Sequence, residues 1–111
     1  MTAERLEQIY YLKGEIQDLQ RRIITAESGK ASALYSGSEY IAYLKRQIAK
    51  CQQEYTELET YISQCDDDLM HYMLVCRFVK RMPWVRVSFE IGGGNTAENC
   101  CKKVSRYLKA N

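Results

Sequence analysis

Apolar residues recur along the middle of the chain at alternating spacings of three and four positions, without interruption between Ile41 and Val79. A repeat of seven sustained over more than about four heptads is typical of a helix that supercoils against a partner. We therefore expect a coiled coil over this segment. The repeat consists of Ile41, Leu44, Ile48, Cys51, Tyr55, Leu58, Ile62, Cys65, Leu69, Tyr72, Cys76 and Val79.

Three adjacent aspartates, Asp66, Asp67 and Asp68, lie within this segment and indicate a break in the helix. Short acidic side chains disfavour a helix interior, but they cap a helix start and interact favourably with its dipole. We expect the coiled coil to end at this run and another helix to begin there. The predicted organisation is a coiled-coil hairpin over residues 1–65 and a second module over 66–111.

A shorter series with the same spacing occupies residues 2–26, and a connection rich in Ser, Gly and Ala follows over residues 27–39. This connection is the clearest candidate loop, and two helices joined in this way most simply fold back as an antiparallel hairpin. Because the second helix is the longer one in this prediction, part of its seam stays uncovered. Exposed heptad residues usually pair with a second copy of the chain, so we expect a homodimer. The residues assigned to this interface are Ile41, Leu44, Ile48, Tyr55, Leu58 and Ile62.

Two short amphipathic segments flank a glycine-rich stretch near the C-terminal end. The first should begin at Pro83, whose fixed φ and missing N–H suit the first helical position. Its apolar residues Trp84, Val87 and Ile91 recur at helical spacing. A run of three glycines then ends it, since glycine tolerates the left-handed conformation of a sharp turn, and Asn95 or Thr96 can cap the next helix. The pattern predicts a helix-turn-helix, with its turn built on Pro83, Trp84, Gly92, Gly93 and Gly94.

The second helix of this pair, over residues 97–109, separates into two faces at about 100° per residue. Six residues share the face expected to pack inward: Ala97, Cys100, Cys101, Val104, Tyr107 and Leu108. The opposite face is basic and carries amides, namely Glu98, Asn99, Lys102, Lys103, Ser105, Arg106 and Lys109. A helix in the major groove needs cations for phosphates and amide or guanidinium groups for base edges, so this face suits DNA. Any surface helix also has a polar face, which is the alternative interpretation.

The distribution of charge favours the DNA interpretation. Residues 77–111 contain eight Lys or Arg and two Glu, whereas residues 1–76 contain eight basic and twelve acidic residues. The module is therefore at +6 and the preceding segment at −4. A basic module joined to an acidic one is typical of a protein in which one part docks on a polyanion.

The same segment carries a family resemblance. It contains Arg77-Phe78-Val79, then Met82-Pro83-Trp84, Val87 and Ser88, and finally Ile91-Gly92-Gly93-Gly94-Asn95-Thr96. In this order the residues resemble the helix-turn-helix of small phage and prophage proteins of Gram-positive bacteria, whose C-terminal region is similar to region 4 of sigma factors. The resemblance covers roughly the last third of the chain and departs from the family at Cys101. Nothing in the chain resembles the promoter-melting part of a full sigma factor.

The resemblance and the face of residues 97–109 together imply a dimeric DNA-binding transcriptional regulator, with this helix in the major groove of double-stranded DNA. Arg81 and Arg86 are expected to hold phosphates, and Trp84 to lock the turn. The other residues expected at the DNA are Asn95, Thr96, Glu98, Asn99, Lys102, Lys103, Arg106 and Lys109. Two alternatives stay open. One is a phage protein-interaction module directed at RNA polymerase or a host defence nuclease, and the other is a small DNA-packaging subunit.

Composition excludes several other classes. A single proline among 111 residues and the lack of alternating Val/Ile segments predict an almost all-α protein. Five cysteines without a C-x-x-C pair predict core thiols rather than disulfides or a metal site. The only histidine, His71, has no local nucleophile on its helix face, and the glycine run follows no strand, so we expect neither an enzyme nor a cofactor. With no apolar leader and no long apolar run, we expect a cytoplasmic protein without membrane contact.

Overall fold

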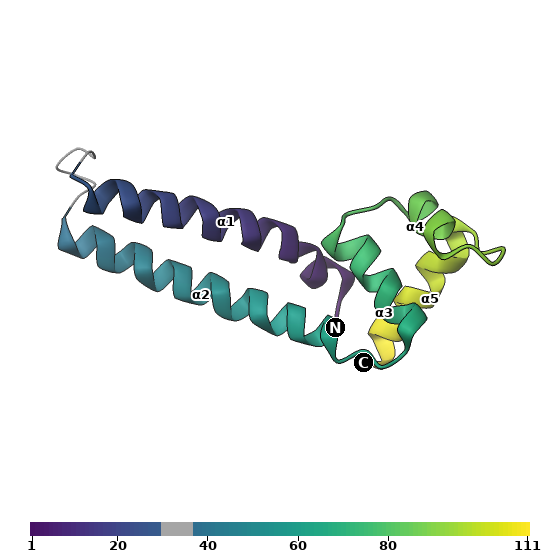
Figure 1. Cartoon of the computed structure of the whole chain (residues 1–111). Coiled ribbons are helices and arrows are strands. Elements are labelled where there is room, and N and C mark those ends of the chain that lie inside the picture. Colours follow the sequence, from purple (N-terminus) through teal and green to yellow (C-terminus); the bar gives the residue numbers. More distant parts are fainter. Residues whose placement is uncertain (30–36) are drawn as a thin grey trace. The chain divides into compact units, whose positions relative to one another are not determined.

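The computed structural model describes residues 1–29 and 37–111, and all regular structure in these two ranges is helical (Figure 1). The expected all-α class is confirmed. Of the loop expected over residues 27–39, positions 30–36 lie outside the described residues. The helices are α1 (Ala3–Glu27), α2 (Ser38–Ser63), α3 (Asp68–Leu74), the π-helical turn η2 (Val75–Val79), α4 (Trp84–Ile91) and α5 (Ala97–Ala110).

The chain packs as two compact units. One unit, which we call the head, consists of Met1–Tyr10 and Leu58–Asn111, and the other, the hairpin unit, consists of Tyr11–Glu57. This division differs from the boundary expected between residues 65 and 66. The beginning of α1 and the end of α2 belong to the head because their apolar side chains are buried there, with Leu6 fully buried and Leu58 1% exposed.

In the hairpin unit, α1 and α2 run antiparallel (Figure 1). Leu12, Leu19 and Leu44 are at most 9% exposed, so heptad positions of the two helices are covered inside one chain. An ion pair of 3.4 Å between Lys45 Nζ and Glu27 Oε1 joins the helices near their connection. The antiparallel hairpin that the spacing predicts is therefore present.

The second helix is longer than the first, as expected, but only by one residue. α1 contains 25 residues and α2 contains 26, because α2 ends at Ser63 instead of following the heptad repeat onward. Burial within the chain leaves only part of the assigned seam open to a second copy, and the homodimer stays a prediction. Among the six assigned residues, Leu44, Leu58 and Ile62 are at most 4% exposed, and Ile41, Ile48 and Tyr55 are half-buried.

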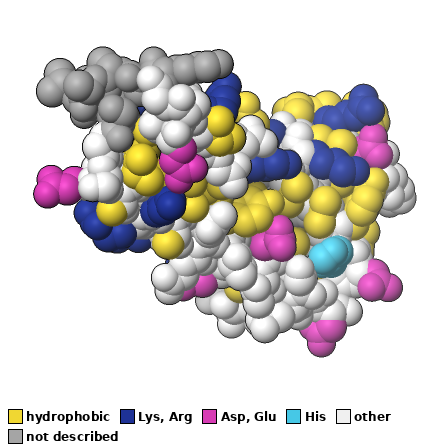
Figure 2. Space-filling view, turned by 60° about the vertical axis from the view of Figure 1, so that its left-hand side comes forward, with side chains coloured by type: hydrophobic (Ala, Val, Ile, Leu, Met, Phe, Trp, Pro, Cys, Tyr) yellow, Lys and Arg dark blue, Asp and Glu magenta, His cyan; other side chains and the backbone are white. Residues whose placement is uncertain are grey.

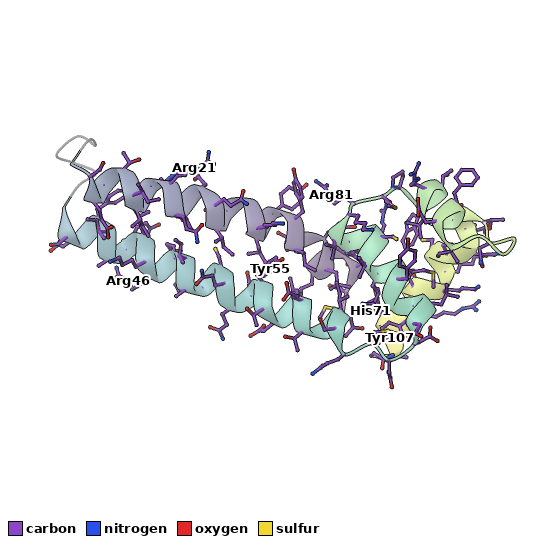
Figure 3. All side chains as sticks on the ribbon, in the orientation of Figure 1. Arg21, Arg46, Tyr55, His71, Arg81 and Tyr107 are labelled. Carbon is purple, nitrogen blue, oxygen red and sulfur yellow. The ribbon has the colours of Figure 1, made fainter. Side chains whose placement is uncertain are left out.

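The aspartate run separates α2 from α3, as expected. Asp67 is the N-cap of α3, and its Oδ1 accepts a hydrogen bond of 2.9 Å from the backbone N–H of Met70. The ring of His71 lies 2.9 Å, measured at Nδ1, from the carbonyl oxygen of Ile62 at the end of α2 (Figure 3). A carbonyl oxygen only accepts, so Nδ1 carries the proton in this contact. His71 therefore fastens α3 to α2, which agrees with a structural histidine.

The head has a compact apolar core that α3, η2, α4 and α5 build together. Burial of each large apolar side chain contributes about 1.5–3 kcal/mol, so this core is the main force that holds α5 in place. The cysteines expected to act as core thiols do so at positions 65, 76 and 100, where they are free and buried. The core includes Met73, Leu74, Cys76, Phe78, Val87, Cys100, Val104 and Leu108.

Candidate nucleic-acid interface

The turn into α4 is held by an arginine that the sequence reading did not assign a role. Arg77 donates a hydrogen bond of 3.0 Å from Nη1 to the carbonyl of Met82, and its guanidinium lies 4.6 Å from the centre of the Trp84 ring. A guanidinium over an indole face is attracted by the ring quadrupole. Arg77 thus connects the end of η2 to the first residue of α4, and the expected locking role of Trp84 depends on this stack.

Pro83 is expected at the first helical position, but it occupies the N-cap, one position before the helix. It is the N-cap of α4, with φ −65° and an extended ψ of 155°, and the helix begins at Trp84. An N-cap residue has non-helical ψ while its carbonyl already accepts the first helical hydrogen bond. That bond is present, at 3.0 Å from the N–H of Val87 to the Pro83 oxygen.

The glycine run forms the sharp turn between α4 and α5. Gly92, Gly93 and Gly94 have φ values of 68°, 65° and 78°, so three successive residues are left-handed. A side chain is strained in this region, whereas glycine enters it freely. The end of the first helix is therefore confirmed. The helix ends here because three successive residues adopt a conformation that costs little only for glycine.

Of the two candidate caps, Thr96 is the one that caps α5. Its Oγ1 accepts a hydrogen bond of 3.1 Å from the N–H of Asn99. Asn95 instead serves the turn, since its Nδ2 donates to the carbonyl of Gly92 over 2.8 Å. Both residues were expected to face DNA, and the structure shows each engaging its side chain within the protein.

The two faces expected for α5 are present. On the inner side, Cys100, Val104 and Leu108 are at most 4% exposed, and the other three residues expected there are half-buried. The remaining expected DNA-facing residues of α5 are all exposed: Glu98, Asn99, Lys102, Lys103, Arg106 and Lys109. α5 thus presents a continuous polar surface with more cations than carboxylates.

The cations of α5 differ in their partners. Lys102 forms an ion pair of 2.9 Å with Glu98 one turn earlier, whereas Lys103 donates over 2.9 Å to the neutral side-chain oxygen of Asn95. Exposed ion pairs of this kind contribute about 0–1 kcal/mol, so a phosphate can replace the carboxylate at low cost. Arg106 and Lys109 add two more positive charges on the exposed side of the helix.

The two arginines expected to hold phosphates both have partners inside the head. Arg86 is ion-paired with Glu90 at 3.2 Å, and the hydroxyl of Tyr72 donates to the same carboxylate at 3.4 Å. Arg81 has a left-handed φ of 55°, and its guanidinium lies 4.2 Å from the centre of the Tyr10 ring (Figure 3). A phosphate contact by either arginine must therefore replace or share an existing contact.

Two apolar residues of α4 point outward and had no role in the sequence reading. Phe89 is 77% exposed and Val85 is 57% exposed. Val87 faces inward, and helical spacing places Phe89, two positions later, near the opposite side. The exposure of Phe89 could therefore be predicted from the sequence. Hydrophobic side chains also remain open to solvent beside Lys and Arg on the face seen in Figure 2.

Three side chains gather where the end of α2 meets α5 in the head. The rings of Tyr61 and Tyr107 are 6.3 Å apart, and Cys65 lies beside both. A hydrogen bond with Cys65, followed by burial, raises the pKa of Tyr107 to about 12. Burial, followed by Cys65, also raises the pKa of Tyr61. Both phenols are therefore neutral near pH 7, and the two rings pack against each other between the end of α2 and α5.

Over residues 1–29 and 37–111, no three His, Cys, Asp or Glu side chains come together in a way that could bind a metal ion. Within the same ranges, the helices are all too short or too polar to cross a membrane. Comparison of the chain with protein-family models, with curated proteins and with solved structures finds no match.

Proposed function

We propose that this protein binds double-stranded DNA through α5 and acts as a transcriptional regulator of phage or prophage type. The observation that carries the proposal is the division of α5 into a buried apolar side and an exposed basic side, directly after a capped glycine turn. A recognition helix needs both sides. The apolar side fixes it to the head, and the basic side meets phosphates and base edges.

The exposed residues of α5 match the chemistry of the major groove. Asn99 offers an amide, which can form two hydrogen bonds with adenine, and Arg106 offers a guanidinium, which can do the same with guanine. Lys102, Lys103 and Lys109 supply point charges for phosphates. Glu90 and Glu98 are the only acidic residues from position 77 onward, and each is paired with a neighbouring cation.

The test begins with selection of bound duplexes from a random pool, followed by titration of the selected duplex at several salt concentrations. The triple variant Lys102→Gln, Lys103→Gln, Arg106→Gln removes three exposed charges from α5. Each phosphate contact adds about −0.9 to the slope of log K against log salt, so the slope should weaken by up to about 2.7. Affinity at low salt should fall by more than about tenfold.

A matched variant controls for net charge. Lys13→Gln, Arg46→Gln, Lys50→Gln also removes three exposed cations, but all three lie in the hairpin unit. This variant should keep the slope and at least about half of the affinity. Equal losses in both triple variants would show that binding is a response to net charge, and would contradict a specific role for α5.

A second candidate function is a protein-interaction module of phage origin, directed at RNA polymerase or a host defence nuclease. The exposed pair Val85 and Phe89 on α4 favours it, since contiguous exposed apolar side chains mark interaction sites. Pull-down with wild-type protein should then recover one stoichiometric host protein, and Phe89→Ser should lose it. A wild-type protein that retains no duplex at low salt but keeps this partner would favour the second function over DNA binding.

A further inference from the structure

Both polar atoms of the Asn95 side chain form hydrogen bonds within the protein. Its Nδ2 donates to the carbonyl of Gly92 at the end of α4, over 2.8 Å, and its Oδ1 accepts from Nζ of Lys103 in α5, over 2.9 Å. The backbone N–H of Asn95 also donates to the Gly92 carbonyl, at 3.3 Å. One half-buried amide thus joins the turn to a lysine eight positions further along the chain.

Lys102 and Lys103 are adjacent and both exposed, yet they differ in the charge of their partners. Lys102 faces the carboxylate of Glu98 at 2.9 Å, so much of its field is cancelled locally. Lys103 faces a neutral amide oxygen, which does not cancel its field as a carboxylate would. An ammonium group has three donors, so two remain for a phosphate after one is given to Asn95.

We propose that Asn95 is a positioning residue, which holds the ammonium of Lys103 in place for a phosphate of the bound duplex. The proposal rests on the proposed DNA-binding function and adds to it the identity of one phosphate contact and its support. A free lysine loses much side-chain freedom when it binds, at a cost of about 0.5–1.5 kcal/mol. The contact with Asn95 removes part of this freedom before the duplex arrives.

The test is a double-mutant cycle on duplex affinity, with Asn95→Ala, Lys103→Gln and the double variant. In the wild-type background, Lys103→Gln should lower affinity about three- to tenfold and weaken the salt slope by about 0.9. In the Asn95→Ala background, the same change should lower affinity by less than about twofold, because Lys103 no longer holds its position. Lys102→Gln serves as the control, and its effect should be equal in both backgrounds.

A purely structural asparagine gives a different result. It would lower the melting temperature when replaced, but the effect of Lys103→Gln would be the same with and without Asn95, and this outcome would overturn the proposal. If Asn95→Ala does not fold, Asn95→Ser replaces it, since a serine hydroxyl is too short to reach Lys103 and can still bond within the turn. An unchanged salt slope in Lys103→Gln would equally overturn the proposal while leaving DNA binding intact. Wild-type protein that binds no duplex would refute the proposed function itself.

Discussion

Replacement of a single buried valine tests whether the core of the head holds α5 in place. Val104 is 1% exposed on the inner side of α5. Val104→Ala removes two buried methyl groups, at about 0.8 kcal/mol each, and leaves a cavity that costs roughly another 1 kcal/mol. Alanine regains about 0.5 kcal/mol through its higher helix propensity. The free energy of unfolding should therefore fall by about 2 kcal/mol.

The control is the same substitution at an exposed position. Val85 is also helical but is 57% exposed, so Val85→Ala has the same gain in helix propensity and little loss of burial. Its free energy of unfolding should change by less than about 0.5 kcal/mol. The comparison of the two variants isolates the contribution of burial.

The assay is urea unfolding followed by tryptophan fluorescence. The chain has one tryptophan, Trp84, at the start of α4, so the signal reports the head. With a denaturant slope of about 2 kcal/mol per molar, the midpoint of Val104→Ala should fall by roughly 1 M. Equal midpoints for Val104→Ala and Val85→Ala would refute the reasoning, since α5 would then not depend on this core.

Three further predictions concern caps, stacking and ionisation in the head. Asp67→Ala should lower the free energy of unfolding by about 1 kcal/mol in urea titration, because α3 loses its N-cap, and Asp67→Asn should retain most of it. Arg77→Lys should lower the melting temperature by several degrees in a calorimetric scan, since an ammonium cannot both stack on Trp84 and bridge the turn; no change would contradict the stack. Tyr107 should titrate near pH 12 in ultraviolet absorbance, owing first to its hydrogen bond with Cys65. Since its pKa is raised in the folded state, its contribution to stability should be full below about pH 10 and lost as the pH rises toward 12; Tyr107→Phe should remove this loss.

The apolar spacing predicted the helices well because both faces of each are decided by local periodicity. The hairpin, the aspartate break, the glycine turn and the inner face of α5 all follow from residues close together in sequence. Lys102 and Glu98 are four positions apart on one helix, so their ion pair could also be foreseen.

The features that the sequence did not predict depend on contacts between distant residues or on a departure from the standard period. The π-helical turn Val75–Val79 has a wider repeat than the 3.6-residue period used to read the segment. The stack of Arg81 on Tyr10 joins positions far apart in the chain, and the spacing of neither one indicates it. Both contacts of Asn95 also depend on how the turn folds back on α5.

The heptad repeat also did not predict how much of its seam is covered within the chain. An uninterrupted heptad repeat indicates that a partner exists, but it does not say whether that partner is a second chain or the same one. Leu44 in the hairpin unit, and Leu58 and Ile62 in the head, are buried within the chain. The lengths of α1 and α2 differ by one residue because α2 ends at Ser63, and pairing of the half-buried positions with a second chain stays a prediction.

Mapping the amide chemical shifts of the labelled protein as a selected duplex is added tests most directly whether α5 binds DNA. If α5 is the recognition helix, the largest changes should fall at residues 96–109 and include Asn99, Lys103 and Arg106, while residues 11–57 should change little. Changes centred on Val85 and Phe89, or on the hairpin unit, would contradict the central claim that the basic side of α5 binds DNA.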